Sequence, residues 1–138
     1  MNTRTALKIL IVEDSKHDAE LLLQALHRAG YEPFSERVDH AEAMRAALAA
    51  KTWDLVISDY VLPRFSGLEA LKILQEAEID IPFVVVSGKI GEEVAVEALK
   101  AGANDYLLKD RLTRLGAAIE RALSETEQRR RRQQSERA

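Results

Sequence analysis

The stretch Leu-Lys-Ile-Leu-Ile-Val-Glu-Asp-Ser, residues 7–15, decides the fold. Its aliphatic beginning is typical of a strand covered on both faces, and it stops at the carboxylates of Glu13 and Asp14. Ser15, followed three residues later by Asp18, resembles the capping box that begins a helix. The stretch therefore predicts a strand that ends in acidic side chains and turns directly into a helix.

The rest of the chain repeats this alternation of strand and helix. Strand-like runs are expected at 7–12, 34–38, 55–58, 82–86 and 106–108. Between and after them, apolar residues recur at helical spacing and predict five helices, the first over 16–29. Their expected boundary residues are Ser15 and Gly30, Asp39 with Glu42, Ser66 with Gly67, and Gly91 with Gly102. Their expected core faces are Ala19, Leu22 and Leu26; Ala41, Met44, Ala47 and Leu48; Leu68, Leu71 and Leu74; Val94, Ala95, Ala98 and Leu99; and Leu112, Leu115, Ile119 and Leu123.

The composition of the strands predicts their order in the sheet. The run at 34–38 carries Ser35, Glu36 and Arg37, so it is expected at an edge. If the short fifth run takes the other edge, right-handed crossovers give the order 2-1-3-4-5 in a five-stranded parallel sheet. The predicted fold is a doubly wound α/β domain with (βα)5 topology. Ligands of such sheets bind outside the carboxyl ends of the strands, where the strand order reverses.

The composition also limits the classes of function. A chain of 138 residues closes one domain core, and a net charge of -3 gives no general attraction to nucleic acid or anionic membranes. The absence of cysteine excludes disulfides and thiol chemistry. The longest apolar run, 81–86, is too short to span a bilayer, and the amino terminus lacks a signal-peptide pattern. We expect a soluble, cytoplasmic protein with no membrane contact.

Polar side chains that follow four of these runs would share one edge of the sheet: Glu13, Asp14, Asp59, Ser87 and Lys109. Clustered carboxylates repel, since two unit charges about 4 Å apart cost on the order of 4 kcal/mol at an effective dielectric of about 20. Hard oxygen ligands without a neighbouring histidine or thiol favour Mg²⁺ as the cation that relieves this repulsion. The sequence therefore predicts a Mg²⁺ site formed by carboxylates.

The same residues are suited to phosphoryl transfer. Asp59 is the expected nucleophile, because a carboxylate can accept a phosphoryl group as an acyl phosphate. The Ser87 hydroxyl, the Gly88 amide and the Lys109 ammonium are the expected groups that bind the phosphoryl oxygens. Singly, each residue has a plainer explanation as a helix cap or a solvated charge. Their joint position at one edge of the sheet favours a phosphoacceptor site over these separate structural roles.

Four sequence blocks, at 9–15, 54–67, 84–88 and 101–109, resemble the receiver domains of two-component response regulators in order and spacing. The resemblance implies a flavodoxin-like, CheY-like fold that takes a phosphoryl group from the phosphohistidine of a partner histidine kinase or phosphotransfer protein. It also implies that the protein is a signalling switch and not an enzyme. The only reactions expected of such a switch are self-phosphorylation from a phosphodonor and autodephosphorylation.

The resemblance assigns roles to individual residues. Asp59 is the phosphoacceptor and a metal ligand, Asp14 is a direct Mg²⁺ ligand, Glu13 is a ligand through water, and Val61 offers its backbone carbonyl to the metal. Glu13 stands where the family more commonly has aspartate. The longer glutamate side chain could shift the position of the water-mediated contact with the metal.

The resemblance also implies a conformational switch. Ser87 and Tyr106 match the family's switch pair, whose movement remodels the face made by the fourth helix, fifth strand and fifth helix. A homodimer through this face, or through the carboxyl-terminal helix, is one expected assembly. Asp110 follows Lys109 where the family usually has proline with a cis peptide, so we expect a trans peptide here.

The carboxyl terminus differs in composition from the rest of the chain. We expect a receiver domain at 1–123 and a polar, Arg-rich helical extension or linker at 124–138. The arginines at 129–132 are expected to form a solvated helix face, so nucleic-acid binding is not expected. The chain is either the amino-terminal module of a longer signalling protein or a single-domain regulator.

Two alternative functions are considered. A Mg²⁺-dependent aspartyl-phosphate phosphatase of the haloacid dehalogenase type also uses a nucleophilic aspartate, a hydroxyl and a lysine. Its nucleophile follows the first strand and has a second aspartate two residues later, whereas Asp59 is followed by Tyr60 and Val61. The other alternative is a degenerate receiver that only binds partners, but none of the expected site residues is missing.

Overall fold

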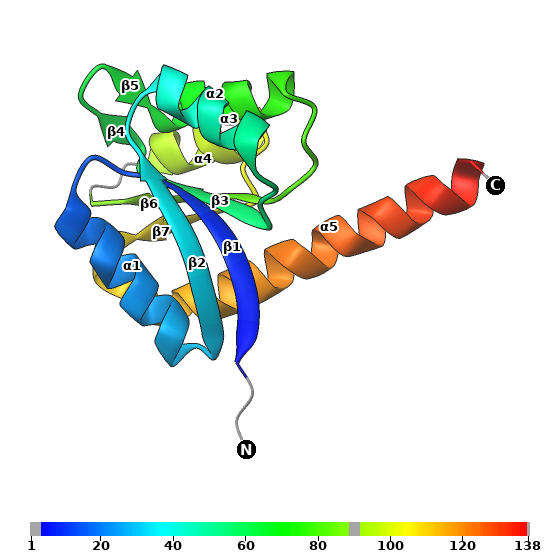
Figure 1. Ribbon diagram of the computed structural model, residues 1–138, viewed down its shortest axis with the longest axis horizontal. Coiled ribbons are helices and arrows are strands. Elements are labelled where there is room, and N and C mark those ends of the chain that lie inside the picture. Colours follow the sequence, from blue (N-terminus) through cyan, green and yellow to red (C-terminus); the bar gives the residue numbers. More distant parts are fainter. Residues whose placement is uncertain (1–3, 89–91, 138) are drawn as a thin grey trace.

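The computed structural model describes residues 4–88 and 92–137, and its centre is a five-stranded parallel sheet. The strands of this sheet are β1 (Thr5–Val12), β2 (Tyr31–Val38), β3 (Leu55–Ser58), β6 (Phe83–Ser87) and β7 (Asp105–Leu108). Their order is β2-β1-β3-β6-β7, and every neighbouring pair is parallel (Figure 1). The predicted fold class and strand order are confirmed. The polar strand β2 is an edge strand, as its composition indicated.

Helices cover both faces of the sheet. They are α1 (Lys16–Arg28), α2 (Ala41–Ala50), α3 (Gly67–Glu76), α4 (Glu92–Ala101) and α5 (Leu115–Arg137), with a 3₁₀ helix η1 (Lys109–Arg114) before the last. Helices α2, α3 and α4 lie on one face, and α1 and α5 lie on the other (Figure 1). Successive residues of β1 alternate between the two cores, since Leu10 packs with the first group and Ile9 and Ile11 with the second. Burial on both faces explains why these strands are continuous in aliphatic residues.

A short antiparallel hairpin after β3 was not predicted from the sequence. It consists of β4 (Val61–Leu62) and β5 (Phe65–Ser66), with Arg64 at its turn in a left-handed conformation (φ 61°). Leu62 and Phe65 are buried in the core beneath α2 and α3. The hairpin thus fixes the loop that leads away from the carboxyl end of β3.

Most of the expected helix boundaries are confirmed. The side chains of Ser15 and Ser66 accept hydrogen bonds from the backbone N–H groups of Asp18 and Glu69, each at 3.1 Å. Gly30 and Gly102 follow helices with φ of 100° and 120°, which side chains disfavour. The expectation at Gly91 lies outside the described residues.

The expected capping box of Asp39 with Glu42 is wrong. The residue that caps α2 is His40, and it makes no side-chain capping hydrogen bond. Asp39 Oδ1 lies 2.9 Å from His40 Nδ1, so the carboxylate is engaged by the neighbouring imidazole and not by the helix backbone. The helix begins one residue later than the sequence pattern indicated.

The expected core faces hold with exceptions on α3 and α4. Leu68 on α3 is only half-buried, and Ala70 and Ile73 are buried with Leu71 and Leu74 instead. Within the described residues of α4, Ala98 alone is buried, while Leu99 is 46% exposed. The stripe of α4 that packs against the sheet is therefore narrow, and Leu99, which is turned about 100° from Ala98 around the helix axis, lies outside it. Leu112 lies in η1 and not in α5.

The last helix extends away from the domain (Figure 1). It is continuous from Leu115 to Arg137, in agreement with the expected extended carboxyl-terminal helix. The part of α5 after Ser124 still contacts the domain, because Thr126 is buried and both Arg129 and Arg130 contact Asp80. Among residues 4–88 and 92–137, no helix combines the length and the apolar character needed to cross a bilayer.

Candidate functional site

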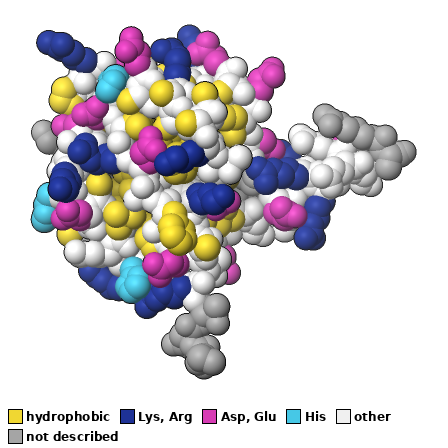
Figure 2. Space-filling view, viewed as in Figure 1, with side chains coloured by type: hydrophobic (Ala, Val, Ile, Leu, Met, Phe, Trp, Pro, Cys, Tyr) yellow, Lys and Arg dark blue, Asp and Glu magenta, His cyan; other side chains and the backbone are white. Residues whose placement is uncertain are grey.

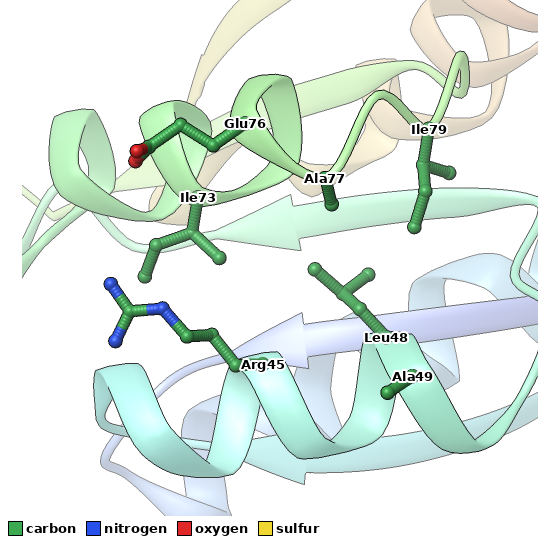
Figure 3. A pocket seen from close by; sticks show the side chains of 7 residues that line it. All are labelled: Arg45, Leu48, Ala49, Ile73, Glu76, Ala77 and Ile79. Carbon is green, nitrogen blue, oxygen red and sulfur yellow. The ribbon is translucent and has the colours of Figure 1, made fainter.

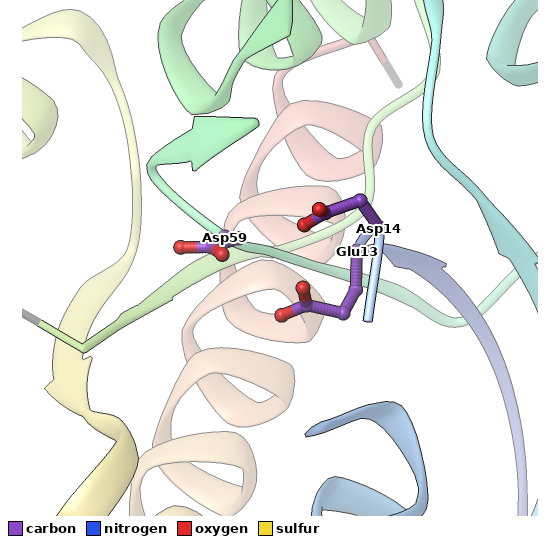
Figure 4. Close-up of side chains that lie close together, drawn as sticks. All are labelled: Glu13, Asp14 and Asp59. Carbon is purple, nitrogen blue, oxygen red and sulfur yellow. The ribbon is translucent and has the colours of Figure 1, made fainter. Parts of the chain in front are cut away.

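Three carboxylates meet at the carboxyl edge of the sheet. Glu13 and Asp14 follow β1 and Asp59 follows β3, and Figure 4 shows their side chains gathered at the ends of these strands. One carboxylate oxygen from each residue lies within 4.8 Å of the others. The backbone N–H of Asp59 donates to the carbonyl of Val12 at 2.9 Å, which holds Asp59 beside the start of the acidic pair. The strand order reverses at this point, as the sequence predicted.

Lys109 joins this cluster from the far side of the sheet. Its Nζ lies 2.7 Å from Glu13 Oε2 and 3.0 Å from Asp59 Oδ2. Lys109 follows β7, which is separated from β3 by β6, so its side chain must reach across the end of β6. A Cβ atom on Gly88, the residue after β6, would lie only 3.9 Å from Lys109 Cδ. Gly88 therefore lies beside the aliphatic part of the lysine.

The cluster contains a fourth carboxylate, Asp18, that sequence reasoning treated only as part of a helix cap. Its Oδ2 lies 2.7 Å from Lys109 Nζ. Asp18 is in the first turn of α1, which begins directly after the acidic pair. Its place in the first turn of the helix predicted to follow the acidic pair was the signal that could have placed it at this edge.

A second residue was missed. Arg37 Nη1 donates to the backbone carbonyl of Glu13 at 3.2 Å from the adjacent strand β2. Parallel pairing aligns Ile11 with Arg37, which brings the guanidinium to the end of β1. No local pattern pointed to this contact.

Burial and charge shift the pKa values of the two central groups. Glu13 is 1% exposed, and its pKa is raised because burial disfavours the charged form more than its hydrogen bonds from Lys109 and Ser15 favour it. Burial alone would lower the pKa of Lys109, but hydrogen bonds to Asp18, Glu13 and Asp59 outweigh it and raise that pKa. Lys109 is therefore a permanent cation at neutral pH.

The backbone around Asp59 is tightly packed. Asp59 Oδ1 accepts a hydrogen bond from the Tyr60 N–H at 2.7 Å, and its side chain is 11% exposed. The Gly67 N–H donates to the Tyr60 carbonyl at 2.7 Å. A Cβ atom on Gly67 would lie 2.8 Å from the Asp59 carbonyl oxygen, closer than real side chains approach. Glycine is therefore required where α3 begins next to Asp59.

The remaining predicted site residues lie on the strands around the cluster. Ser87 is the last residue of β6 and is buried. Tyr106 is half-buried on β7, which pairs with β6 so that Tyr106 lies opposite Val85. Val61 begins β4, two residues after Asp59, with its side chain 69% exposed. No cis peptide bond occurs in the part of the chain that the structure describes, so the expected trans peptide between Lys109 and Asp110 is confirmed.

The cluster is chemically suited to Mg²⁺. Its ligand atoms are carboxylate oxygens, which hard cations prefer, and Asp14 is exposed, so the cluster is open to solvent. The carboxylates of Glu13, Asp14, Asp18 and Asp59 outnumber the ammonium of Lys109 that contacts three of them. A divalent cation would offset the excess negative charge.

A separate groove lies between α2 and α3 and contains none of these residues. It has a volume of about 410 Å³ (Figure 3). Its lining consists of Arg45, Leu48, Ala49, Ile73, Glu76, Ala77 and Ile79. On the molecular face shown in Figure 2, Lys and Arg side chains are interspersed with Asp and Glu, so this face carries no patch of a single sign.

A doubly wound parallel sheet with an acidic cluster and a lysine at its switch point defines the class of this protein: an α/β domain whose site is suited to a divalent cation and an anionic group. Residues 9–120 match the family model of the response regulator receiver domain. The chain belongs to this family, which serves signalling and is not a family of classical enzymes.

Individual relatives agree with this assignment. The chain is 33% identical over 103 residues to the phosphate regulon regulator PhoB of Pseudomonas aeruginosa, covering 73% of this chain and 44% of PhoB. It is 29% identical over 102 residues to the chemotaxis protein CheY of Thermotoga maritima, covering 74% of this chain and 84% of CheY. The crystal structure of full-length FixJ from B. japonicum superposes with a TM-score of 0.76 at 31% identity, covering 89% of this chain and 60% of FixJ. The chain spans less than half the length of the PhoB, PhoP and NtrC regulators that it matches.

Proposed function

We propose that this protein accepts a phosphoryl group on Asp59 from the phosphohistidine of a partner histidine kinase or phosphotransfer protein. The observation that supports this most directly is the contact of Asp59 with Lys109, whose Nζ lies 3.0 Å from Asp59 Oδ2. A nearly buried carboxylate is thereby held beside a fixed cation and within an acidic cluster. This arrangement provides a nucleophile and positive charge for the oxygens of an incoming phosphoryl group.

The proposed transfer forms one bond and breaks another. A carboxylate oxygen of Asp59 forms the new bond to phosphorus, and the bond from phosphorus to the donor imidazole nitrogen breaks with its electron pair left on that nitrogen. The Lys109 ammonium binds a phosphoryl oxygen and offsets its charge. The Ser87 hydroxyl and the Gly88 N–H donate hydrogen bonds to the other phosphoryl oxygens.

The metal is proposed to be Mg²⁺. Asp14 and Asp59 would hold it directly, Glu13 through a water molecule, and Val61 through its backbone carbonyl. When bound, Mg²⁺ supplies positive charge that reduces the repulsion between the acidic cluster and an anionic phosphoryl group. The chemistry of the donor set supports this, because three carboxylates can offer oxygen ligands within 4.8 Å of one another.

Ser87 and Tyr106 are proposed as the switch pair that responds to phosphorylation. They lie on the adjacent strands β6 and β7, next to the surface made by α4, β7 and α5. We propose that this surface, or the carboxyl-terminal helix, mediates homodimer formation or contact with an output module.

The receiver domain is proposed to occupy residues 1–123, with residues 124–138 as a helical extension. Arg129 and Arg130 are engaged by Asp80, and Arg131 pairs with Glu127 at 3.2 Å. Because these arginines are already paired with acidic groups, a role in binding nucleic acid has little support. The extension is better suited to connect the domain to another module of a longer signalling protein, or to terminate a single-domain regulator.

The test is phosphorylation by acetyl phosphate with Mg²⁺, followed by intact mass. We expect wild type and Asp110→Asn to gain the mass of one phosphoryl group and Asp59→Asn to gain none. Asp110 is an exposed aspartate next to Lys109 and serves as the matched control. Equal labelling of Asp59→Asn and wild type, or labelling of neither, would contradict the proposal. Steady turnover of a small phosphate ester would favour the alternative of a Mg²⁺-dependent aspartyl-phosphate phosphatase.

A further inference from the structure

Tyr60 connects the phosphoacceptor to a distant helix. Its backbone N–H donates to Asp59 Oδ1 at 2.7 Å, and its hydroxyl donates to Glu97 Oε2 at 3.3 Å. Glu97 lies on α4, which is separated from Tyr60 by α3 and β6 in the sequence. The backbone carbonyl of Tyr60 also accepts the Gly67 N–H at the start of α3. Tyr60 thus contacts the Asp59 carboxylate, the first residue of α3 and the side chain of Glu97 on α4.

Helix α4 has little apolar burial to hold it in place. Ala98 is its one buried residue within 92–101, while Val96 and Leu99 are 47% and 46% exposed. Segments with few buried apolar contacts open more easily than the core. A polar contact such as the one between Tyr60 and Glu97 therefore provides a larger share of the stability of α4 than it would for a well-buried helix.

The Tyr60 hydroxyl is a donor under ordinary conditions. Burial and the nearby Glu97 carboxylate raise the pKa of Tyr60, and Tyr106 adds to this effect. The phenol therefore keeps its proton at neutral pH and can donate to Glu97.

We propose that Tyr60 is a positioning residue that couples Asp59 to α4: its N–H orients Asp59 Oδ1, and its hydroxyl holds α4 through Glu97 in the unphosphorylated protein. This inference rests on the proposed phosphorylation of Asp59. Hydrogen bonds to a carboxylate anion are stronger than those to a neutral carbonyl oxygen. Phosphorylation converts the Asp59 carboxylate into a neutral acyl group, which weakens the hydrogen bond from the Tyr60 N–H. We expect the hydrogen bond from the Tyr60 hydroxyl to Glu97, which holds α4, to weaken with it.

Hydrogen exchange of the amides of residues 92–101, without phosphodonor, tests the contact with α4. We expect Tyr60→Phe and Glu97→Ala each to speed this exchange roughly threefold, consistent with loss of one modest hydrogen bond. The double variant should exchange no faster than either single variant, and Glu97→Gln, which keeps an acceptor oxygen, should remain near wild type. Tyr31→Phe removes a half-buried phenol at the start of β2 and is the matched control. Wild-type exchange of α4 in Tyr60→Phe, or equal acceleration in Tyr31→Phe, would overturn the inference.

Exchange after phosphorylation tests the coupling to Asp59. With acetyl phosphate and Mg²⁺, we expect α4 exchange to rise in wild type and to rise less in Tyr60→Phe, where the contact is already lost. An equal rise in both proteins would refute the coupling. Failure of Asp59 to gain phosphoryl mass would contradict the proposed function, while exchange without phosphodonor would still decide whether Tyr60 and Glu97 hold α4.

Discussion

Lys109 Nζ lies 3.0 Å from Asp59 Oδ2, although the strands that precede these residues are not neighbours in the sheet. The contact spans the carboxyl end of β6, where Gly88 leaves room for the lysine side chain. A lysine in this position can serve two roles. It reduces repulsion within the acidic cluster of the resting protein, and it can bind a phosphoryl group once one is attached.

Removal of the Lys109 charge should destabilise the fold. Lys109→Met keeps the aliphatic chain but leaves the carboxylates of Glu13, Asp18 and Asp59 without their shared cation. We expect a loss of roughly 2 kcal/mol in the free energy of unfolding at neutral pH without Mg²⁺, because breaking a partly buried ion pair leaves uncompensated charge. Urea denaturation measures this change. Lys72→Met, at an exposed lysine on α3, is the control and should change stability little.

Mg²⁺ should stabilise the folded protein. Mg²⁺ at about ten times its dissociation constant should add about 1.4 kcal/mol to the unfolding free energy. Asp14→Asn should weaken this effect strongly because it removes a proposed direct ligand, whereas Asp110→Asn should leave it intact. Thermal unfolding across a Mg²⁺ titration provides the measurement. Identical titrations of Asp14→Asn and wild type would argue against Asp14 as a ligand.

The acidic cluster should give stability a specific pH dependence in metal-free buffer. Burial raises the pKa of Glu13 above its ordinary value of 4.5, so the folded state favours the protonated carboxyl. The contribution of Glu13 is therefore most favourable below that value and is lost as the pH rises through its folded pKa. Relative to wild type, Glu13→Gln should become progressively more stable between pH 4.5 and neutrality, as measured by urea denaturation with a chelator. A difference in unfolding free energy between Glu13→Gln and wild type that does not change with pH would contradict the raised pKa of Glu13.

Gly67 should tolerate no side chain. In Gly67→Ala, the new Cβ would lie 2.8 Å from the Asp59 carbonyl oxygen and 3.1 Å from Tyr60 Cα, and these backbone atoms cannot move aside as a flexible side chain could. We expect a loss of about 1–3 kcal/mol in unfolding free energy, typical of overpacking. Gly88→Ala, whose Cβ would meet its nearest atom at 3.9 Å, should cost less. Equal losses in the two variants, measured by chemical denaturation, would show that close approach is not the cause.

Asp80 should anchor the carboxyl-terminal helix. Its side chain pairs with both Arg129 and Arg130, and its backbone carbonyl accepts from Arg130. Asp80→Asn should speed hydrogen exchange in residues 124–137 a few-fold while changing domain stability by no more than about 0.5 kcal/mol, because exposed ion pairs contribute little. Glu127→Gln, which affects the pair with Arg131, is the control and should leave the anchor in place. If both variants exchange alike, the contact with Asp80 does not hold the helix.

The sequence by itself determined the fold class, the strand order and the edge of the sheet that carries the site. Aliphatic runs covered on both faces distinguish central strands from the polar edge strand β2, and parallel strands bring their carboxyl ends to one edge. These are local patterns combined with general topology. They are sufficient to place Glu13, Asp14, Asp59 and Lys109 at the same edge of the sheet.

Only the tertiary structure decided which polar groups pair. The contact of Asp18 with Lys109, the capping of α2 by His40 and the pairing of Asp80 with Arg129 and Arg130 depend on distances between separate elements. Long charged side chains can reach several partners, and no periodicity in the sequence selects among them. The hydrogen bond between Tyr60 and Glu97 is of the same kind, because it exists only where β3 and α4 are brought together by the packing of the sheet against its helices.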